Sequence, residues 1–408
     1  MDTYSAHATV LRDPAGGTRA AAPRLARPKI LIYSHDTFGL GNIRRSLLLG
    51  ELLGSAYPQS AILLMTGSPM VHAFRIPQRM DYVKLPCVTR VNADEYEPRF
   101  LTDCTDEIRR TRSEILERTS VAFQPDLLIV DKRAGGIDGE LLPALAALRA
   151  LPRPPRVVLG IRDILDAPEK TRQSLTTNGS FETIERFYDE IWIYGSPEVF
   201  DAVHEYAFPP EVARRTRYCG YLRRRSVRKL PHAGAPRVLV TPGGGDDGDR
   251  LVSSYLTGLA DVPPSEFQSV VVLGPQLAEH AAEPLRRLAE RPDVECIDFE
   301  PDLTRRYEEA DVVLSMAGFN TVCELLTGRL RAVLVPRAEP VQEQLIRARR
   351  LAARGYFRMI EPAELSPARL IAETRLALEA PIPDISPIDM EGLARIRTRV
   401  ARLLEGRM

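Results

Sequence analysis

The chain has 408 residues, of which 44% are hydrophobic and 27% charged, a balance typical of folded globular proteins. This length predicts two or three domains and excludes a single small module. The 55 basic residues equal the 55 acidic residues in number, so no excess of positive charge favours nucleic acid as a partner. No run of 18 apolar residues occurs, and we expect no membrane span.

The N-terminal segment and the cysteines both bear on where the protein works. Residues 1–27 are rich in alanine, arginine, glycine and proline and lack the apolar core of a signal peptide, so we expect a disordered tail and no export. The five cysteines are widely separated and have the spacing of neither a disulfide framework nor a zinc site. These features predict a cytoplasmic protein.

From residue 28 onward, short apolar segments alternate with longer helical patterns. This alternation predicts an α/β fold with parallel sheets covered by helices on both faces. The first expected strands lie at 30–33, 61–65, 82–85, 127–130, 157–160 and 191–194. Six such strands complete a doubly wound domain, which we place at residues 28–222.

A polar segment, residues 223–235, is predicted to link this domain to a second one, and its arginines fit a solvated hinge better than a nucleic-acid patch. The second domain, residues 236–380, is expected to have strands at 238–241, 269–273, 294–297, 312–314 and 332–335, with helices at 246–260, 276–290, 302–309, 320–327 and 341–354. Residues 381–408 are expected to form a proline-rich crossing segment and a terminal helix at 390–404. Two facing α/β domains predict a cleft, with ligands at the carboxyl ends of the strands.

The first predicted strand runs into a glycine-rich turn that opens a helix. Glycines let the backbone approach a ligand, and the free N–H groups of a helix start favour an anion. A tight turn without a ligand is an alternative. A dinucleotide site is disfavoured, because Arg44 takes the place of the third glycine of that fingerprint. The candidate residues of this turn are His35, Asp36, Gly39, Gly41 and Arg44.

A second glycine-rich turn, Gly243, Gly244 and Gly245, follows the first strand of the second domain and is another candidate for binding an anion. It continues into Asp247-Gly248-Asp249, which resembles the metal-binding D-x-D motif of some glycosyltransferases. Acidic residues at a helix start are ordinarily caps, worth ~0.5–2 kcal/mol, and the sequence favours that interpretation. No metal site is therefore predicted.

The segment 310–326 combines a strand, a turn of small residues and a helix. The strand is expected to end at Ser315, with Asn320 or Thr321 capping the helix and Glu324 in its first turn. Such a helix start can bind a diphosphate, and Glu324 can accept hydrogen bonds from a ribose diol. A structural cap in which Glu324 compensates the helix dipole is equally consistent with the pattern.

Several motifs together point to one family. They are Phe299-Glu300-Pro301-Asp302-Leu303, Ala317-Gly318, Asn320-Thr321 with Glu324, Val335-Pro336 and Glu343-Gln344. Through them, residues 293–350 resemble the donor domain of the family-28 glycosyltransferases, which include the bacterial N-acetylglucosaminyltransferase that makes the lipid intermediate of peptidoglycan. Residues 33–41, 131–141 and 160–166 resemble a predicted-glycosyltransferase branch of the same GT-B superfamily. The resemblance implies the GT-B fold, with two Rossmann-like domains across a cleft.

The resemblance also implies a nucleoside-diphosphate sugar, expected to be a UDP-sugar, as donor substrate, with no resident cofactor. It assigns the nucleobase to the backbone of Glu300 and the ribose to Glu324. It assigns the diphosphate to the two glycine-containing turns at 243–245 and 318–321, and the donor sugar to Glu343 and Gln344.

The family's first turn usually carries a histidine where this chain has Asn42, and an amide cannot act as a general base. Asn42 then orients an acceptor or phosphate while His35, Asp36 or Asp163 takes the proton, or ordinary transfer chemistry is lost. Among these candidates His35 is favoured. A histidine merely satisfied by hydrogen bonds is the alternative.

On the acceptor side, the candidates at predicted strand ends are Asp131, Arg162 and Asp163. Arg162 and Asp163 either bind the acceptor or orient the base, or they form an interdomain salt bridge, worth ~0–1 kcal/mol if exposed. The sequence leaves these two roles equal.

We therefore predict a glycosyltransferase that moves a sugar from a nucleoside-diphosphate sugar to a small-molecule or glycan acceptor, with inversion and without a metal. Nucleic acid is not expected as a partner, and peripheral contact with a membrane stays open. A nucleotide-sugar epimerase or hydrolase of the same fold and a non-catalytic nucleotide-sugar-binding protein remain alternatives. A dinucleotide oxidoreductase is a more distant one.

Overall fold

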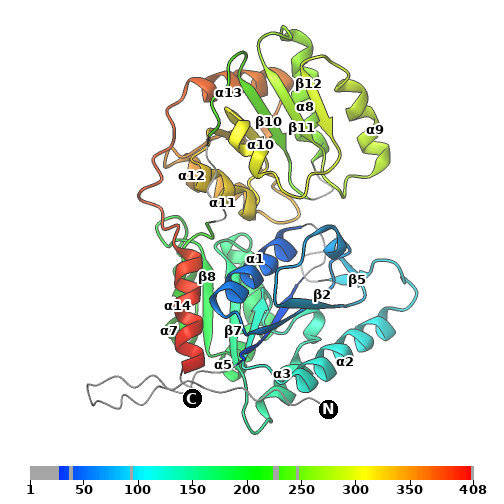
Figure 1. Cartoon of the computed structure of the whole chain (residues 1–408), viewed down its shortest axis with the longest axis vertical. Helices are drawn as coiled ribbons and strands as arrows, with labels where there is room; N and C mark the ends of the chain where they lie inside the picture. The colour runs from blue at the N-terminus through cyan, green and yellow to red at the C-terminus, as the bar shows by residue number, and fades with distance from the viewer. Residues whose placement is uncertain (1–26, 36–39, 92–94, 224–228, 245–247, 406–408) are drawn as a thin grey trace, which may run out of the picture.

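The computed structural model describes residues 27–35, 40–91, 95–223, 229–244 and 248–405. Two parallel sheets dominate it, one in each half of the chain, with helices packed on their faces (Figure 1). The predicted α/β class is confirmed. The tail expected at the N-terminus lies outside the described residues, except for Arg27.

The first sheet has seven strands in the order β3-β2-β1-β6-β7-β8-β9. Its central strands consist of apolar residues buried on both faces, as expected for a parallel sheet between helical layers. The strands are β1 (Lys29–Ser34), β2 (Ala61–Thr66), β3 (Met80–Lys84), β6 (Leu127–Asp131), β7 (Arg156–Arg162), β8 (Glu190–Tyr194) and β9 (Thr216–Tyr218). The helices around it are α1 (Gly41–Ala56), α2 (Thr105–Phe123), α3 (Leu142–Arg149), α4 (Pro168–Thr177), α5 (Ser180–Phe187), α6 (Ala202–Glu205) and α7 (Pro210–Arg215).

A small antiparallel pair, β4 (Val88–Arg90) and β5 (Tyr96–Pro98), stands beside the first sheet. The sequence did not predict this hairpin. Its strands have three residues each, too short to show a periodic pattern.

The second sheet has six strands in the order β12-β11-β10-β13-β14-β15. They are β10 (Arg237–Thr241), β11 (Gln268–Val272), β12 (Val294–Ile297), β13 (Val312–Ser315), β14 (Ala332–Leu334) and β15 (Arg358–Met359). The helices of this half are α8 (Asp249–Gly258), α9 (Glu279–Leu288), α10 (Thr304–Glu309), α11 (Phe319–Gly328), α12 (Glu343–Ala352) and α13 (Pro367–Glu379).

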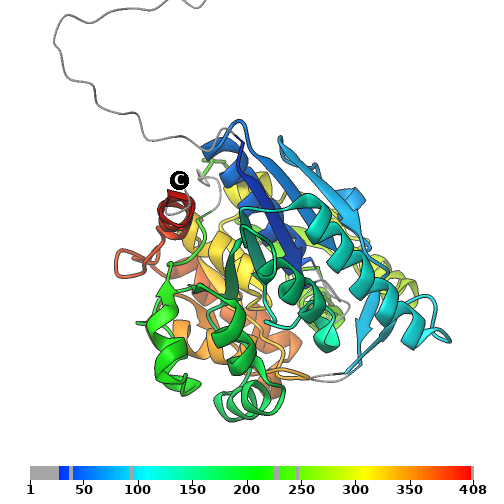
Figure 2. The same ribbon diagram turned by 90° about the horizontal axis from the view of Figure 1, so that it is seen from below.

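The C-terminal helix α14 (Gly392–Glu405) returns to the first half and lies beside α1 and the first sheet (Figures 1 and 2). Its apolar residues Ile396, Val400 and Leu404 are buried there. The last helix in the sequence is therefore part of the first layered unit.

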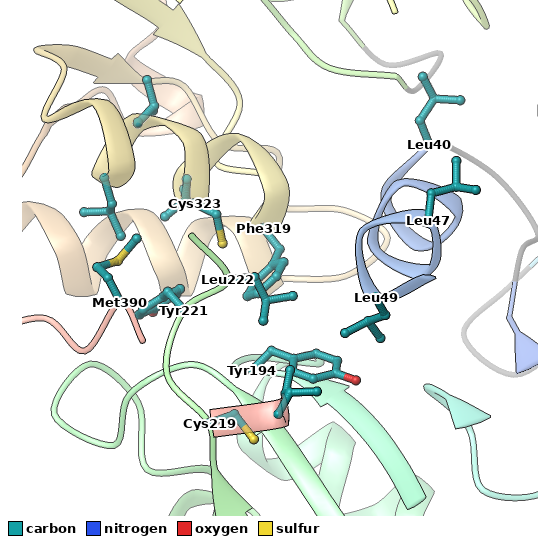
Figure 3. Packing of buried hydrophobic residues seen from close by; sticks show 14 of the residues in the cluster. Leu40, Leu47, Leu49, Tyr194, Cys219, Tyr221, Leu222, Phe319, Cys323 and Met390 are labelled. Atoms are coloured by element: carbon teal, nitrogen blue, oxygen red, sulfur yellow. The ribbon is translucent and has the colours of Figure 1, made fainter. Parts of the chain in front are cut away.

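A single apolar cluster crosses the boundary between the two halves. It joins Leu47 and Leu49 of α1 to Phe319 and Cys323 of α11, with Tyr194 at the end of β8 beneath them (Figure 3). The starts of α1 and α11, which follow the first strand of one sheet and a central strand of the other, are held together by these contacts.

Candidate functional site

Two helix N-termini meet at the boundary. The helix α1 begins at Gly41 and α11 begins at Phe319, and the Nδ2 of Asn320 donates a hydrogen bond of 2.9 Å to the carbonyl of Gly41. Neither N-cap residue, Leu40 or Gly318, caps its helix with a side chain. Among the described residues, the N-cap side chains leave the first N–H groups of both helices uncapped, and the positive ends of two helix dipoles lie in one region, which favours an anion there.

The predicted cap of α11 is wrong. Gly318, not Asn320 or Thr321, is the N-cap residue, and Glu324 lies in the second turn of the helix. The helix starts earlier because Phe319, expected in the turn, is its first residue and is buried in the interdomain cluster. The side chain of Asn320 is thereby released to reach the other half of the molecule.

Glu324 forms an ion pair with Arg44 across the boundary, with Arg44 Nη2 2.8 Å from Glu324 Oε1. Arg44 lies in the first turn of α1, where a cation is unfavourable for the helix dipole, and the carboxylate of Glu324 offsets that cost. The carboxylate assigned to a ribose is thus held by a cation from the opposite half.

The glycine-rich turn after β10 packs against the start of α1. Gly243 has a φ of +109°, and a Cβ added at Gly244 would stand 2.5 Å from Cγ of Leu40. Ser315, at the end of β13, donates a hydrogen bond of 2.6 Å to the carbonyl of Thr241 and so ties the ends of β10 and β13 together. The turn residue Gly245 lies outside the described residues.

Glu343, at the start of α12, is the centre of a group of cations. Its carboxylate is 2.6 Å from Arg162 Nη1 and 3.8 Å from the guanidinium groups of both Arg337 and Arg347. Burial by itself would raise the pKa of Glu343, but Arg162 and the other cations lower it to about 2. The neighbouring Gln344 accepts a hydrogen bond of 3.3 Å from the backbone N–H of Arg337.

Asp163 is fully buried and bound to Arg347 by two hydrogen bonds of 2.7 and 3.1 Å. The hydroxyl of Tyr221 donates a third bond to the carboxylate, 3.0 Å long, and Arg347 also donates to the carbonyl of Ala317. The pairs Asp163–Arg347 and Arg162–Glu343 both join the two domains. They are salt bridges of the kind that the sequence offered as the alternative role for Arg162 and Asp163. The geometry favours a positioning role for Asp163 over proton removal.

Sequence reasoning missed Arg347, although a signal was present. Arg347 stands four residues after Glu343, on the face of α12 that also carries buried Ala348 and Leu351. Burial disfavours its charge, but Asp163 more than compensates and keeps the pKa of Arg347 raised. An arginine on an otherwise buried helical face predicts a paired carboxylate.

His35, directly after β1, is buried with its Nε2 3.3 Å from the hydroxyl of Tyr96, and the two rings meet edge to face. Among the described residues its Nδ1 has no hydrogen-bond partner. Burial and the nearby Lys132 and Arg133 hold the pKa of His35 well below its usual value. The neutral form of the imidazole is therefore favoured, with Nδ1 as its unpaired ring nitrogen among the described residues.

Asn42 and Asp131 hold the turn after β1 in place. Asn42 Nδ2 donates to the carbonyl of His35, and its Oδ1 accepts a bond of 2.8 Å from Arg45. The buried guanidinium of Arg45 also binds both carboxylate oxygens of Asp131, at 2.8 and 2.6 Å. Both ends of the Asn42 amide are thus engaged within the first domain.

The structure describes some of the other predicted site residues but not all of them. Glu300 accepts a hydrogen bond of 2.9 Å from Arg306, and Thr321 is nearly buried in α11. Asp36 and Gly39 lie outside the described residues. Asp249 is the first residue of α8, as the dipole interpretation requires, whereas its partner Asp247 is outside the described residues.

The described part of the chain contains no group of three or more His, Cys, Asp or Glu residues that could hold a metal ion. Among the same residues, no helix is both long and apolar enough to cross a membrane.

The fold and the second domain together show which class of protein the chain resembles. Residues 238–383 match the model of the glycosyltransferase family 28 C-terminal domain. Solved glycosyltransferase structures with matching folds cover most of the chain. The resemblance predicted from the sequence is confirmed: the chain is family-28-like and has the GT-B fold.

Particular relatives carry one name, UDP-N-acetylglucosamine--N-acetylmuramyl-(pentapeptide) pyrophosphoryl-undecaprenol N-acetylglucosamine transferase. The relative from Corynebacterium efficiens is 29% identical over 144 residues, which cover 35% of this chain and 37% of the relative. The relative from Phenylobacterium zucineum is 27% identical over 219 residues, covering 48% of this chain and 58% of the relative. The chain therefore matches these relatives over only part of their length.

Solved structures resemble the chain over nearly its whole length. The MurG of Acinetobacter baumannii superimposes with a TM-score of 0.58 at 14% identity, covering 92% of this chain and all of that one. The calicheamicin glycosyltransferase CalG4 gives a TM-score of 0.59 at 16% identity, covering 93% and 99%. At this identity, the likeness shows the shared fold.

Proposed function

We propose that this chain is a glycosyltransferase that takes a nucleoside-diphosphate sugar as donor and transfers the sugar to an acceptor with inversion and without a metal. One observation carries the proposal: the N-termini of α11 and α1, neither capped by the side chain of its N-cap residue, meet with Glu324 beside them. A diphosphate supplies the anion that this geometry favours, and a ribose supplies the diol that a carboxylate binds.

The names of the relatives support this choice, because they specify transfer of N-acetylglucosamine from a UDP-linked donor. A UDP-sugar is therefore the first donor to test. We also propose that the protein works in the cytoplasm, as expected from the number and spacing of its cysteines.

In the proposed reaction, an oxygen of the acceptor attacks the anomeric carbon as the bond from that carbon to the diphosphate breaks. His35 takes the acceptor proton on Nδ1, since its Nε2 already faces Tyr96. Arg44 moves from Glu324 to the departing diphosphate, and the helix N-termini stabilise the negative charge that develops there. Glu324 is then available to the ribose.

Thermal stabilisation by UDP, GDP, dTDP and their sugars, with NAD as control, tests the donor site. A nucleotide at 100 times its Kd adds ~2.7 kcal/mol to stability. We expect one nucleoside diphosphate to stabilise the protein and Glu324→Gln to abolish that shift, while Glu364→Gln, an exposed carboxylate of the same half, retains it. Absence of any shift in the wild type, or an unchanged shift in Glu324→Gln, would refute the donor site.

A non-catalytic nucleotide-sugar-binding protein is the second candidate, favoured by one observation. Asn42, where the family usually has histidine, uses both ends of its amide within its own domain. Such a protein binds the donor but releases no free nucleoside diphosphate with any acceptor. Release of the diphosphate that disappears in His35→Gln supports transfer chemistry instead.

A further inference from the structure

A cavity of about 390 Å³ lies beside the boundary, in the first half of the chain. It is bounded by α4, α5 and the strands β7 and β8, and the segment Pro340–Val341 of the second half closes one wall. A water molecule takes up about 30 Å³ in the liquid, so a cavity of this volume holds about a dozen non-hydrogen atoms. None of the roles assigned above uses this cavity.

Part of the cavity lining is apolar and already shielded from water. Leu159 and Ile161 of β7, Ile184 of α5 and Ile191 of β8 belong to this part, and all four are buried. Ligand cavities are typically lined in this way, because an apolar body gains free energy on leaving water. These apolar side chains fit a compact hydrocarbon or aromatic group.

The lining of the cavity also carries positive charge. Arg90, Lys132, Arg133 and Lys170 line it, against the single carboxylate of Asp166. That carboxylate is engaged, because its Oδ1 accepts hydrogen bonds from the backbone N–H groups of Ala167 and Gln342 at 2.7 and 2.8 Å. An anionic group is the natural complement of these lining cations.

Among the lining cations, Lys132 gives the strongest support for an anionic ligand. Within the described chain, it forms no hydrogen bond and no ion pair within 4 Å, although it lines the cavity. Burial, together with the cations Arg162, Arg90 and Arg133, holds the pKa of Lys132 well below its usual value, and Glu343 offsets this effect only in part. A bound anion would supply the missing partner.

The cavity also adjoins the proposed reaction centre. Lys132 directly follows Asp131, which anchors Arg45, and the bond from Gln342 to Asp166 fixes the cavity wall to the start of α12. The donor-sugar candidate Glu343 is the next residue along that helix. The cavity is therefore lined by residues of both halves and joined by a hydrogen bond to the start of α12.

We propose that this cavity binds a small anionic molecule with a compact apolar body, its phosphate or carboxylate at Lys132 and its body among Leu159, Ile184 and Ile191. The molecule is the acceptor, an assignment that rests on the proposed function. The binding itself does not depend on that function and is tested separately.

Octyl phosphate, with about a dozen non-hydrogen atoms, is the probe, used below its micelle-forming concentration and measured by calorimetric titration. Octanoate tests a carboxylate in place of the phosphate, while octanol and inorganic phosphate each lack one half of the recognised chemistry. We expect octyl phosphate or octanoate to bind at least tenfold more tightly than octanol or inorganic phosphate. The stronger of the two anions identifies the acceptor's charged group.

Variants then locate the binding. Lys132→Met should weaken binding of the preferred anion at least tenfold, whereas Lys29→Met, an exposed lysine at the opposite end of β1 from this edge of the sheet, should leave it unchanged. Leu175→Gln, on the partly buried apolar wall of α4, should weaken binding of the octyl probes without changing the response to inorganic phosphate. Equal binding of octanol, or full binding by Lys132→Met, would overturn the proposal.

A final titration separates this proposal from the proposed function. If the cavity is an acceptor site, UDP and the octyl anion bind together and their thermal shifts add. Competition between them would place the anion in the donor site and overturn the assignment. If the protein binds the octyl anion at Lys132 but no nucleotide, the cavity proposal stands and the proposed glycosyltransferase function is refuted. If it binds only UDP, the proposed donor site stands and the cavity proposal is refuted.

Discussion

Arg347 and Asp163 place two opposite charges completely out of water between the two halves of the chain. Such a pair costs desolvation free energy when it forms, so its net contribution is small, but each partner becomes essential once the other is present. Removing one charge leaves the other buried without compensation.

The first prediction follows from this dependence. Arg347→Met should lower the free energy of unfolding by about 3–5 kcal/mol, because Asp163 is left charged and buried. The matched control is Arg349→Met on the same helix, whose pair with Glu361 is largely exposed and worth ~0–1 kcal/mol. Urea denaturation of the two variants measures the difference, and equal losses would contradict the argument.

Acid sensitivity at Glu343 is the second prediction. Its pKa of about 2 in the folded chain lies below the ordinary value of 4.5, so the unfolded chain binds the proton first as the pH falls. The stabilisation is complete above pH 4.5 and is lost between pH 4.5 and 2, by about 3 kcal/mol at most. Urea denaturation at several pH values should show this slope in the wild type and a flatter curve in Glu343→Gln. Parallel curves would show that Glu343 is not the group responsible.

At the scale of elements, the glycine-rich turn after β10 and the start of α1 are in close contact. The Cβ of an alanine at position 244 would overlap the Leu40 side chain, with contacts of 2.5 to 2.9 Å. Because the φ of Gly244 is not positive, the substitution introduces no backbone strain of its own. Its effect therefore reports the contact between the halves.

The third prediction uses that contact. Gly244→Ala should destabilise the protein by about 1–3 kcal/mol through overpacking. Leu40→Ala should restore most of that loss in the double variant, since it removes the overlapping atoms. A double-mutant cycle in urea measures this coupling. If the two losses simply add, the turn and α1 do not touch in solution.

The elements themselves were largely predictable. Buried parallel strands are short apolar runs, and the 238–241 and 312–314 segments show this pattern locally. The helix α13 was overlooked although its start was legible, with Ser366 capping the backbone of Arg369 and Pro367 at the first helical position. The two-residue strand β15 gives no local pattern at all.

The pairing within the candidate site could not be predicted in the same way. Arg44 and Glu324 are 280 residues apart, and Asp163 and Arg347 are 184 apart. Each residue was visible as a charge near a strand end or helix start, but nothing local specifies which charge meets which. Folding of the two halves against each other decides those partners.

At the scale of the whole molecule, the terminal helix α14 brings the end of the chain back from the second half to the first sheet. The carboxylate of Glu190 accepts hydrogen bonds from Trp192 Nε1 at 2.8 Å and from Arg399 Nε of α14 at 3.0 Å. Trp192 is the only tryptophan in the sequence and is fully buried in β8. Its fluorescence therefore reports the first sheet and the docking of α14.

The fourth prediction is that the two halves unfold together, since one apolar cluster crosses their boundary and continues into α14. Trp192 fluorescence and far-UV circular dichroism should give coincident urea transitions. Ile396→Ala should move both by about 2–5 kcal/mol, because it opens a cavity under α14, while the exposed Thr398→Ala on the same helix should move neither. A fluorescence transition that shifts while the dichroism splits into two steps would show that the halves are independent.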